Sequence, residues 1–285
     1  MSFCDPTTFN MFDKFLLSQK GKIIHQIWFG TIPSKRQAKK QYEKLQYCRN
    51  SWASCNPSWN IVEWNKYMCT TLITTFYKKH LKMFKNYKYE IQRCDMVRYL
   101  ILHRYGGWYA DMDYYCNKPL DNAMEIYTND LYFVQSPNNI LTQNDDHISN
   151  SLMYSIPNNN FWRIVMLELE KTQKCYSFYT KHMEVMSTTG PGVLNRIYSK
   201  YKHKHRIKSL PHKLFHPYGI NDNILKSFKL GSKIYTAHMS KGSWEQIDSK
   251  IYLYLYREWK ILLFILITMI TPNLIYHFLF NKLTR

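Results

Sequence analysis

The sequence predicts an α/β fold in one large domain, followed by an apolar C-terminal segment that predicts a membrane helix. Short apolar runs alternate with longer amphipathic stretches, which is typical of a sheet covered by helices. Hydrophobic residues make up 45% of the 285 residues, which is enough for a substantial core. The stretch 261–280 contains no Asp, Glu, Lys or Arg.

The first part of the chain alternates between strands and helices. The apolar run 22–29 predicts a first buried strand, and a basic helix follows over roughly 35–54. An Asn-Pro-Ser sequence ends this helix before a second strand at 59–64, and a helix is expected around 67–84. In such an arrangement nucleotides bind at the carboxyl ends of the strands, so we expect the functional residues there.

The second part continues the pattern less regularly. Residues 131–135 predict another strand, followed by a polar loop to Ser149. A helix is expected over 158–174, and the turn 188–192, rich in Thr, Gly and Pro, leads into a helix from Val193.

The most informative stretch runs from Asp95 to Asp113. An amphipathic helix carries Asp95 and Arg98 three residues apart, so both lie on one face. A Gly-Gly pair ends this helix, and a short aromatic strand follows. That strand leads to Asp111 and Asp113, which at a spacing of two point the same way from an extended backbone. Paired carboxylates at a strand end suit a divalent cation that carries a diphosphate. An Asp pair in an exposed turn is the simpler alternative. Five features in register argue against it: a charged helix, its apolar spacing, the Gly-Gly stop, the aromatic strand and the paired Asp residues.

The charge balance indicates an anionic partner. Lys and Arg number 39 against 20 Asp and Glu, a net charge of +19. Nucleotide diphosphates, acidic lipids and nucleic acids all fit this charge. The basic residues are dispersed without an aromatic-interleaved stripe, so we expect no nucleic-acid partner. A basic membrane- or nucleic-acid-binding protein without catalysis remains the alternative class.

The seven cysteines are scattered, and none forms a C-x-x-C pair. This spacing argues against a zinc ribbon and against a dense disulfide framework. Reduced thiols are the simplest interpretation, which leaves room for one or two disulfides.

The two ends of the chain differ in their relation to membranes. Residues 1–20 lack the basic start and continuous apolar stretch of a secretory signal. At the other end, 20 apolar residues at about 1.5 Å each would just cross a hydrocarbon core of roughly 30 Å. A Pro-Asn pair and a histidine inside this segment leave a hairpin or an interfacial helix open, and basic residues on both flanks leave its orientation open. We expect a catalytic domain over residues 1–250 and a membrane-anchoring segment over 257–281.

Several sequence blocks resemble glycosyltransferase family 32, the enzymes with a D-x-D sugar-binding region. This family includes fungal Golgi α-mannosyltransferases and the catalytic subunits that mannosylate inositol-phosphoceramide, with the large clostridial glucosylating toxins as more distant relatives. The blocks keep the family's order and span residues 22–244. They are I-I-H-Q-I-W-F-G, N-P-S-W-N-I-V-E-W-N, C-D-M-V-R-Y-L-I-L-H-R-Y-G-G-W-Y-A-D-M-D, T-G-P-G, L-P-H-K-L-F-H-P and A-H-M-S-K-G-S-W.

The resemblance implies a GT-A-type, Rossmann-like nucleotide-sugar transferase domain with Mn²⁺ or Mg²⁺ and retention of the anomeric configuration. It implies transfer of a hexose, with mannose from GDP-mannose favoured and a UDP-sugar as the other donor. The implied acceptor is a membrane lipid of the inositol-phosphoceramide type, while protein and polysaccharide acceptors stay open. A Golgi or ER-type endomembrane location is favoured; the side of the membrane and any regulatory subunit stay open.

By the same resemblance, three residues are expected to contact the donor. Trp28, at the end of the first strand, would stack on the donor base, which an indole face can do at roughly 1–3 kcal/mol per base. Asp95 and Arg98 would bind the donor sugar and the diphosphate. Core packing of Trp28 and a purely structural ion pair are the alternatives.

The resemblance also implies the metal ligands and the residues near them in the site. Asp111 and Asp113 match the metal motif, with Asp113 the direct ligand and Asp111 acting through the ribose or a bound water. His238 adds a neutral imidazole, which suits Mn²⁺ beside carboxylates; a hydrogen-bonded surface histidine is the alternative. The hydroxyl of Ser243 and the indole N–H of Trp244 would bind the β-phosphate oxygens.

Catalysis is expected to depend on Asp111, Asp113 and Arg98. Breaking the sugar–phosphate bond leaves negative charge on the diphosphate, which a cation and Arg98 stabilise more in the transition state than in the ground state. Retention without an evident buried nucleophile implies front-face attack by the acceptor hydroxyl. Three further carboxylates are candidates for a base or nucleophile: Asp145, Asp146 and Asp222.

Overall fold

The computed structural model describes residues 6–30, 36–121, 123, 129–137, 147–173, 179–217 and 231–239, with 247–248, 251, 254 and 258. The chain divides into two compact units, residues 1–179 with 183–243 and residues 180–182 with 244–285. The first unit contains the sheet and the candidate site. The predicted boundary near residue 250 stays a prediction.

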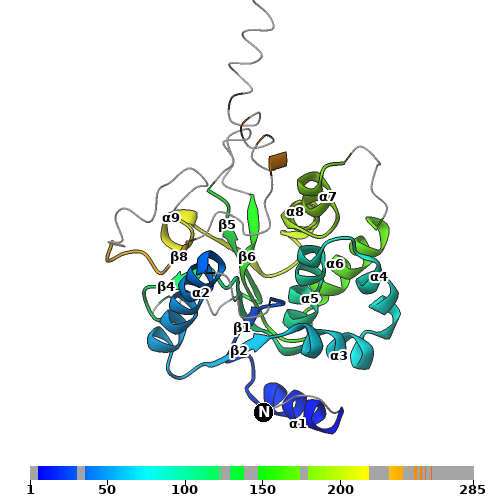
Figure 1. The fold of residues 1–285 in the computed structure, drawn as a ribbon, viewed down its shortest axis with the longest axis horizontal. Coiled ribbons are helices and arrows are strands. Elements are labelled where there is room, and N and C mark those ends of the chain that lie inside the picture. Colours follow the sequence, from blue (N-terminus) through cyan, green and yellow to red (C-terminus); the bar gives the residue numbers. More distant parts are fainter. Residues whose placement is uncertain are drawn as a thin grey trace, which may run out of the picture. The chain divides into compact units, whose positions relative to one another are not determined.

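A six-stranded sheet in the order β2-β1-β3-β6-β5-β7 forms the centre of the first unit (Figure 1). Strand β6 runs antiparallel to both of its neighbours, β3 and β5, and the other paired strands are parallel. The predicted α/β fold is therefore confirmed as a mixed sheet. Its strands are β1 Ile23–Ile27, β2 Asn60–Trp64, β3 Gly107–Ala110, β5 Leu131–Gln135, β6 Ile148–Ser155 and β7 Ile207–Leu210.

Helices cover both faces of the sheet, and two apolar clusters fill the space between them. One cluster joins α1, α3, α4, α5, α6 and α8 to one face, and the other joins α2 and α9 to the opposite face. Strand β1 contributes to both, because Ile23 and Ile27 belong to the first cluster and Ile24 to the second. The helices are α1 Pro6–Ser18, α2 Arg36–Cys55, α3 Lys66–Phe76, α4 Leu81–Asn86, α5 Glu90–Tyr105, α6 Asn160–Lys171, α7 Lys181–Thr188, α8 Pro191–Tyr201 and α9 His212–Phe215.

A second, two-stranded sheet lies on the α2 side. Strand β4, Tyr114–Cys116, pairs antiparallel with β8, Thr236–His238. In this register Tyr114 faces His238 and Cys116 faces Thr236. The pairing brings residue 238 next to the D-x-D segment, more than 120 positions earlier in the chain.

The link between α5 and β3 requires its two glycines. Gly106 and Gly107 both have positive φ, 65° and 84°, and a Cβ on Gly107 would lie 2.4 Å from the Ile23 carbonyl oxygen. His25 secures this turn: its Nε2 donates to the Gly106 carbonyl at 3.0 Å, while its Nδ1 accepts from Trp64 Nε1 at 3.1 Å. Burial lowers the pKa of His25 to about 3, so the imidazole stays neutral. The predicted helix stop is confirmed.

Two predicted elements need correction. The helix expected around 67–84 is broken into α3, a 3₁₀ turn at Lys78–His80, and α4. Tyr77 leaves the helical conformation (φ −131°) and its hydroxyl bonds His103 Nδ1 at 2.7 Å on α5. The loop expected to reach Ser149 ends earlier, because β6 begins at Ile148. The polar start of β6 carries side chains that hydrogen-bond within the fold, so it lacks the apolar pattern that marks a strand.

Within the described part of the chain, no helix has the length and apolar character needed to cross a bilayer. The predicted segment 257–281 lies outside the described residues, apart from Glu258. The membrane anchor therefore stays a prediction.

Candidate functional site

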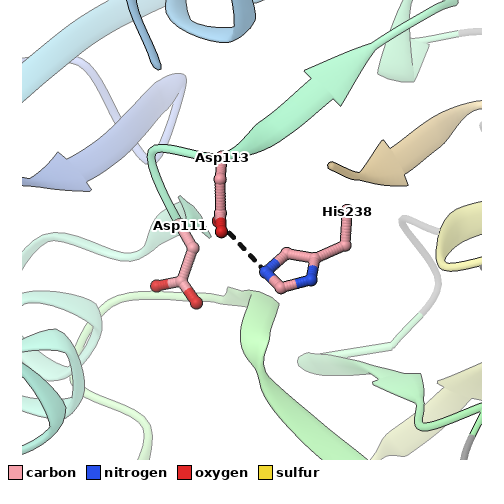
Figure 2. Close-up of side chains that lie close together, drawn as sticks. All are labelled: Asp111, Asp113 and His238. Carbon is pink, nitrogen blue, oxygen red and sulfur yellow. Dashed lines mark ion pairs between the residues drawn. The ribbon is translucent and has the colours of Figure 1, made fainter. Parts of the chain in front are cut away.

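Asp111, Asp113 and His238 converge at the carboxyl end of β3 (Figure 2). Asp111 directly follows β3, Asp113 directly precedes β4, and His238 is the last residue of β8. One ligand atom from each residue lies within 4.8 Å of the other two. The closest approach joins His238 Nε2 and Asp113 Oδ1 at 3.0 Å. The structure thus brings together the three residues expected to bind a metal.

The two aspartates do not stand on an extended strand, as their spacing predicts, but on a tight turn. The Tyr114 amide donates to the Asp111 carbonyl at 3.0 Å, which closes the turn over Met112 and Asp113. The Asp111 amide donates to the Ser151 carbonyl of β6 at 2.8 Å, so the start of this turn is fixed by the antiparallel neighbour. At the other end the Met239 amide donates to the Asp113 carbonyl at 2.8 Å. The carboxylates converge because the turn is held from both sides.

The chemistry of this cluster fits a divalent cation. Two carboxylates and an imidazole form a mixed oxygen and nitrogen donor set, which suits Mn²⁺, and the carboxylates alone suit Mg²⁺. Burial raises the pKa of Asp111, and the nearby Asp113 carboxylate raises it further, although Arg98 opposes both effects. Two carboxylates held this close gain from an added positive charge. Ligation itself stays a prediction.

Behind the cluster, Arg98 joins two carboxylates in the interior. Its Nη2 lies 3.0 Å from Asp95 Oδ1, and its Nη1 lies 3.1 Å from Asp111 Oδ1. Arg98 Nη1 also donates to the Asn150 carbonyl at 2.8 Å. The side chains of Asp95 and Arg98 are only 4% and 3% exposed. The expected placement of these two residues on one helix face is confirmed. They form a buried ion pair, the alternative interpretation of the sequence, and their donor-binding role stays a prediction.

Three residues that the sequence did not single out complete this network. Asn150 Nδ2 donates to Asp95 Oδ1, and Thr189 Oγ1 donates to Asp95 Oδ2, each at 3.0 Å. The Tyr109 hydroxyl donates to Asp111 Oδ1 at 2.7 Å. A usable signal existed only for Thr189, which lies in the T-G-P-G turn. Asn150 lies in a stretch expected to border a loop, and Tyr109 was assigned only to a buried strand.

Burial sets the charge states in this network. Burial raises the pKa of Asp95 to about 6, although Arg98 and the hydrogen bond from Thr189 pull it down. Burial also acts to lower the pKa of Arg98, but Asp111, Tyr109 and Asp95 outweigh it and hold that pKa well above its ordinary value. Arg98 therefore stays charged. Its buried Nε has no hydrogen-bond partner among the described residues, which leaves one donor of the guanidinium unused.

Trp28 follows β1 directly and is half-buried. Its amide donates to the Trp64 carbonyl at 2.9 Å, and its ring lies 5.8 Å from the Tyr42 ring between centroids. Gly30 lets the chain pass close to the indole, because a Cβ there would lie 2.5 Å from Trp28 Cζ2. The indole is thus held at the carboxyl edge of the sheet, and its stacking on a base stays a prediction.

The remaining predicted residues lie outside the described part of the chain. These are the two expected phosphate ligands, Ser243 and Trp244, and the three candidate carboxylates, Asp145, Asp146 and Asp222.

Residues 42–144 match the family described as "Glycosyltransferase sugar-binding region containing DXD motif". Inositol phosphoceramide mannosyltransferase 2 of Schizosaccharomyces pombe is 27% identical over 242 residues, which cover 83% of this chain and 61% of the relative. Mannosyl phosphorylinositol ceramide synthase CSH1 of Saccharomyces cerevisiae is 29% identical over 182 residues, covering 64% of this chain and 43% of the relative. The chain thus spans less than two thirds of the length of these relatives.

Solved structures with a similar arrangement include PaToxG glycosyltransferase, with a TM-score of 0.42 and 15% identity, covering 69% of this chain and 76% of that one. Glycosyltransferase GlyE of Streptococcus pneumoniae has a TM-score of 0.45 and 12% identity, covering 79% of this chain and 56% of that one.

Proposed function

We propose that this chain, which resembles the glycosyltransferases with a DXD-containing sugar-binding region, transfers a hexose from a nucleotide-diphosphate sugar to an acceptor hydroxyl. One observation carries the proposal: the ligand atoms of Asp111, Asp113 and His238 lie within 4.8 Å of one another. Directly behind them the buried Arg98 provides a permanent positive charge. This combination suits a site where a diphosphate leaves.

Asp111, Asp113 and His238 are the residues that would hold the divalent cation, Mn²⁺ or Mg²⁺. When bound, the cation supplies Lewis-acid stabilisation of the leaving diphosphate. His238 can serve as a neutral ligand, with Nε2 directed at Asp113. Tyr109 and Arg98 orient the Asp111 carboxylate through Oδ1, so this ligand is held in place before the donor arrives.

Arg98 is the residue that stabilises the charge of the leaving diphosphate. Its guanidinium stays protonated, because three anionic or polar neighbours outweigh its burial. Asp95 orients it from one side, and Asp95 is itself held by Asn150 and Thr189. The Arg98 Nε–H is buried and has no hydrogen-bond partner among the residues that the structure describes, and we assign it to a phosphate oxygen or a sugar hydroxyl of the donor.

The acceptor hydroxyl attacks the anomeric carbon on the face that the diphosphate leaves. Its proton passes to a departing phosphate oxygen, so the configuration is retained without a protein nucleophile. No carboxylate among the described residues needs to act as a base in this sequence of events. The domain is assigned to the GT-A type, with Trp28 stacking on the donor base at the end of β1.

The sugar is mannose, donated by GDP-mannose, and the acceptor is an inositol-phosphoceramide-type lipid. The names of the two yeast relatives support mannose as the sugar and inositol phosphoceramide as the acceptor. The net charge of +19 supports this acceptor independently, because the acceptor headgroup and its membrane are anionic. Residues 257–281 would anchor the enzyme in an endomembrane of the Golgi or ER.

The test is a transfer assay with the full chain in lipid nanodiscs. GDP-mannose, UDP-glucose and UDP-galactose are offered with inositol phosphoceramide, phosphatidylinositol or ceramide, each with Mn²⁺ or a chelator, and products are identified by mass spectrometry. We expect mannosylated inositol phosphoceramide that requires the cation. Transfer from a UDP-sugar alone would overturn the assigned sugar, and no turnover of any donor would overturn the glycosyltransferase proposal.

A further inference from the structure

Two cysteines from distant parts of the chain meet beside the two-stranded sheet β4–β8, next to the candidate metal cluster. Cys55 is the last residue of α2, and Cys116 is the last residue of β4. Cys55 Sγ lies 3.3 Å from the Cys116 carbonyl oxygen, to which the thiol donates. When Cys55 is a thiolate, it accepts a hydrogen bond from the Cys116 thiol. Cys55 Sγ therefore lies against the Cys116 backbone, and the two side chains are neighbours.

The two thiols differ in their access to solvent. Cys55 is half-buried, whereas Cys116 is 1% exposed. Cys116 Sγ accepts from Asn56 Nδ2 at 3.3 Å and donates to the Lys118 carbonyl at 3.2 Å. The Cys116 amide also donates to Ser51 Oγ at 2.8 Å. An accessible sulfur thus lies near one that is fixed from several sides and shielded from solvent.

The pKa of the Cys55 thiol also differs from those of the other described cysteines. The hydrogen bond from Cys116 lowers the pKa of Cys55 to about 7, although partial burial opposes this. Burial instead raises the pKa of Cys48 and of Cys94 to about 12, and raises that of Cys69 well above its usual value. Because the thiolate is the nucleophile, Cys55 is the reactive sulfur among the described cysteines at neutral pH.

We propose that Cys55 and Cys116 form a thiol-modification site that reacts with low-molecular-weight disulfides and closes to an intramolecular disulfide. The Cys55 thiolate attacks one sulfur of glutathione disulfide, and the first glutathione leaves as a thiolate. The Cys116 sulfur then attacks Cys55 and breaks the mixed disulfide, and its proton passes to the departing second glutathione. Two protein thiols are oxidised, and one glutathione disulfide is reduced to two thiols.

This disulfide would tie the end of α2 to the two-stranded sheet β4–β8, which adjoins the candidate metal ligands. Asp113 lies one residue before β4, and His238 lies on the strand paired with it. The bond would close a chain loop from residue 55 to residue 116, which restricts the unfolded chain and stabilises the folded one. The proposal is independent of the donor and acceptor assigned above.

The test uses the reduced full chain, incubated with oxidised glutathione at pH 8 and analysed by intact mass and peptide mapping. We expect the loss of two hydrogens, a Cys55–Cys116 cross-linked peptide, and no retained glutathione. Cys116→Ser should instead trap one glutathione on Cys55, because the resolving thiol is absent. Cys48→Ser, which alters a neighbouring buried thiol, should behave like the parent. A cross-link from Cys55 to another cysteine, or no adduct on Cys55 in folded Cys116→Ser, would overturn the proposal.

A second measurement does not require a variant. The rate of Cys55 alkylation by iodoacetamide, followed by peptide mass in the unaltered chain, should rise with a midpoint near pH 7. The rate at Cys48 should stay low through pH 9. Cys116→Ser keeps a hydroxyl donor and should preserve the Cys55 midpoint, whereas Cys116→Ala should shift it upward by about one unit or more. A midpoint at the ordinary thiol value of about 8.5 in the parent would contradict the proposed reactivity.

Discussion

Helix α5 contributes an arginine to two aspartate–arginine pairs, one at its C-terminal end and one in its middle, and the two pairs are built differently. At the C-terminal end, Arg104 Nε and Nη2 reach the two oxygens of Asp13 at 2.6 and 2.7 Å. The Tyr105 hydroxyl donates to the same carboxylate at 2.7 Å. The guanidinium also lies 3.2 Å from the centroid of the Phe76 ring. One arginine and one carboxylate satisfy each other, and α1 is thereby held against α5.

In the middle of α5, Arg98 is shared between Asp95 and Asp111 instead of closing on one partner. Its Nε has no partner among the described residues. Burial raises the pKa of Asp95 to about 6, so this carboxyl group takes up a proton at a higher pH than an ordinary aspartate does. Asp111 belongs at the same time to the candidate metal cluster.

This difference indicates that the Arg104 pair stabilises the fold and that the Arg98 pair serves the candidate site. An ion pair with complete bidentate bonding leaves no donor or acceptor for a ligand, and breaking it costs stability. In the other pair, one arginine is shared between two carboxylates and keeps an unused donor. The arginine can therefore interact with a phosphate, and the Asp111 carboxylate can interact with a cation. The Arg104 pair is therefore expected to control folding, and the Arg98 pair to control chemistry.

The largest expected effect is on catalysis. Arg98→Lys keeps one positive charge but loses the planar contacts to Asp95 and Asp111. We expect donor turnover to fall by about 10²–10³-fold, the range for removal of one transition-state donor. Steady-state kinetics of the folded protein measure this. Arg104→Lys is the matched control and should stay within about threefold of the parent; equal losses in both variants would show that the two pairs do not differ in role.

The next effect is on stability. Asp13→Ala leaves the partly exposed Arg104 guanidinium and the buried Tyr105 hydroxyl without their acceptor, which we expect to cost roughly 1–3 kcal/mol. Urea unfolding should show this loss, while the specific activity of the remaining folded fraction stays near that of the parent. If Asp13→Ala removes activity and leaves the free energy of unfolding unchanged, the two roles are reversed.

Cation binding should stabilise the protein through the cluster of Asp111, Asp113 and His238 and should not depend on the Asp13–Arg104 pair. A ligand at 100 times its dissociation constant adds about 2.7 kcal/mol to the free energy of unfolding. We expect thermal melts to rise with Mn²⁺ and to return on chelation. His238→Gln should lower the rise, and Asp13→Asn should leave it intact. An equal rise in His238→Gln would exclude this histidine from the site.

The smallest effect is a pH dependence. Asp95 keeps its proton up to about pH 6 in the folded state, whereas an unfolded Asp loses it near pH 3.9. Its contribution to stability is thus complete below about pH 4 and is lost as the pH rises through about 6. In chelator, the free energy of unfolding of the parent should fall by roughly 2 kcal/mol over this interval relative to Asp95→Asn. The free energy of unfolding is measured by urea unfolding at each pH. If it changes with pH in the same way in both proteins, the pKa of Asp95 has its ordinary value.

The sequence predicts the local parts of this site well. Three-residue spacing placed Asp95 and Arg98 on one face of a helix, and the ion pair at 3.0 Å confirms it. Two glycines placed the helix stop, because few other residues adopt their positive φ. The D-x-D segment was placed at the correct strand end, but its backbone is a turn and not an extension of β3.

The parts that depend on distant contacts could not be predicted. Asn150 reaches Asp95 because β6 runs antiparallel beside β3, and strand direction is not encoded in a short polar stretch. Asp13 pairs with Arg104 across 91 positions, and no local pattern announces such a contact. Both were missed for the same reason: their role arises from tertiary packing.

The most direct test of the catalytic centre compares donor hydrolysis by the parent, Asp113→Asn and Asp13→Asn at equal folded concentrations, with GDP-mannose and Mn²⁺. We expect cation-dependent turnover by the parent and by Asp13→Asn, and a loss of at least about 100-fold in Asp113→Asn. Unchanged turnover in Asp113→Asn would contradict the claim that the Asp111, Asp113 and His238 cluster is the catalytic centre.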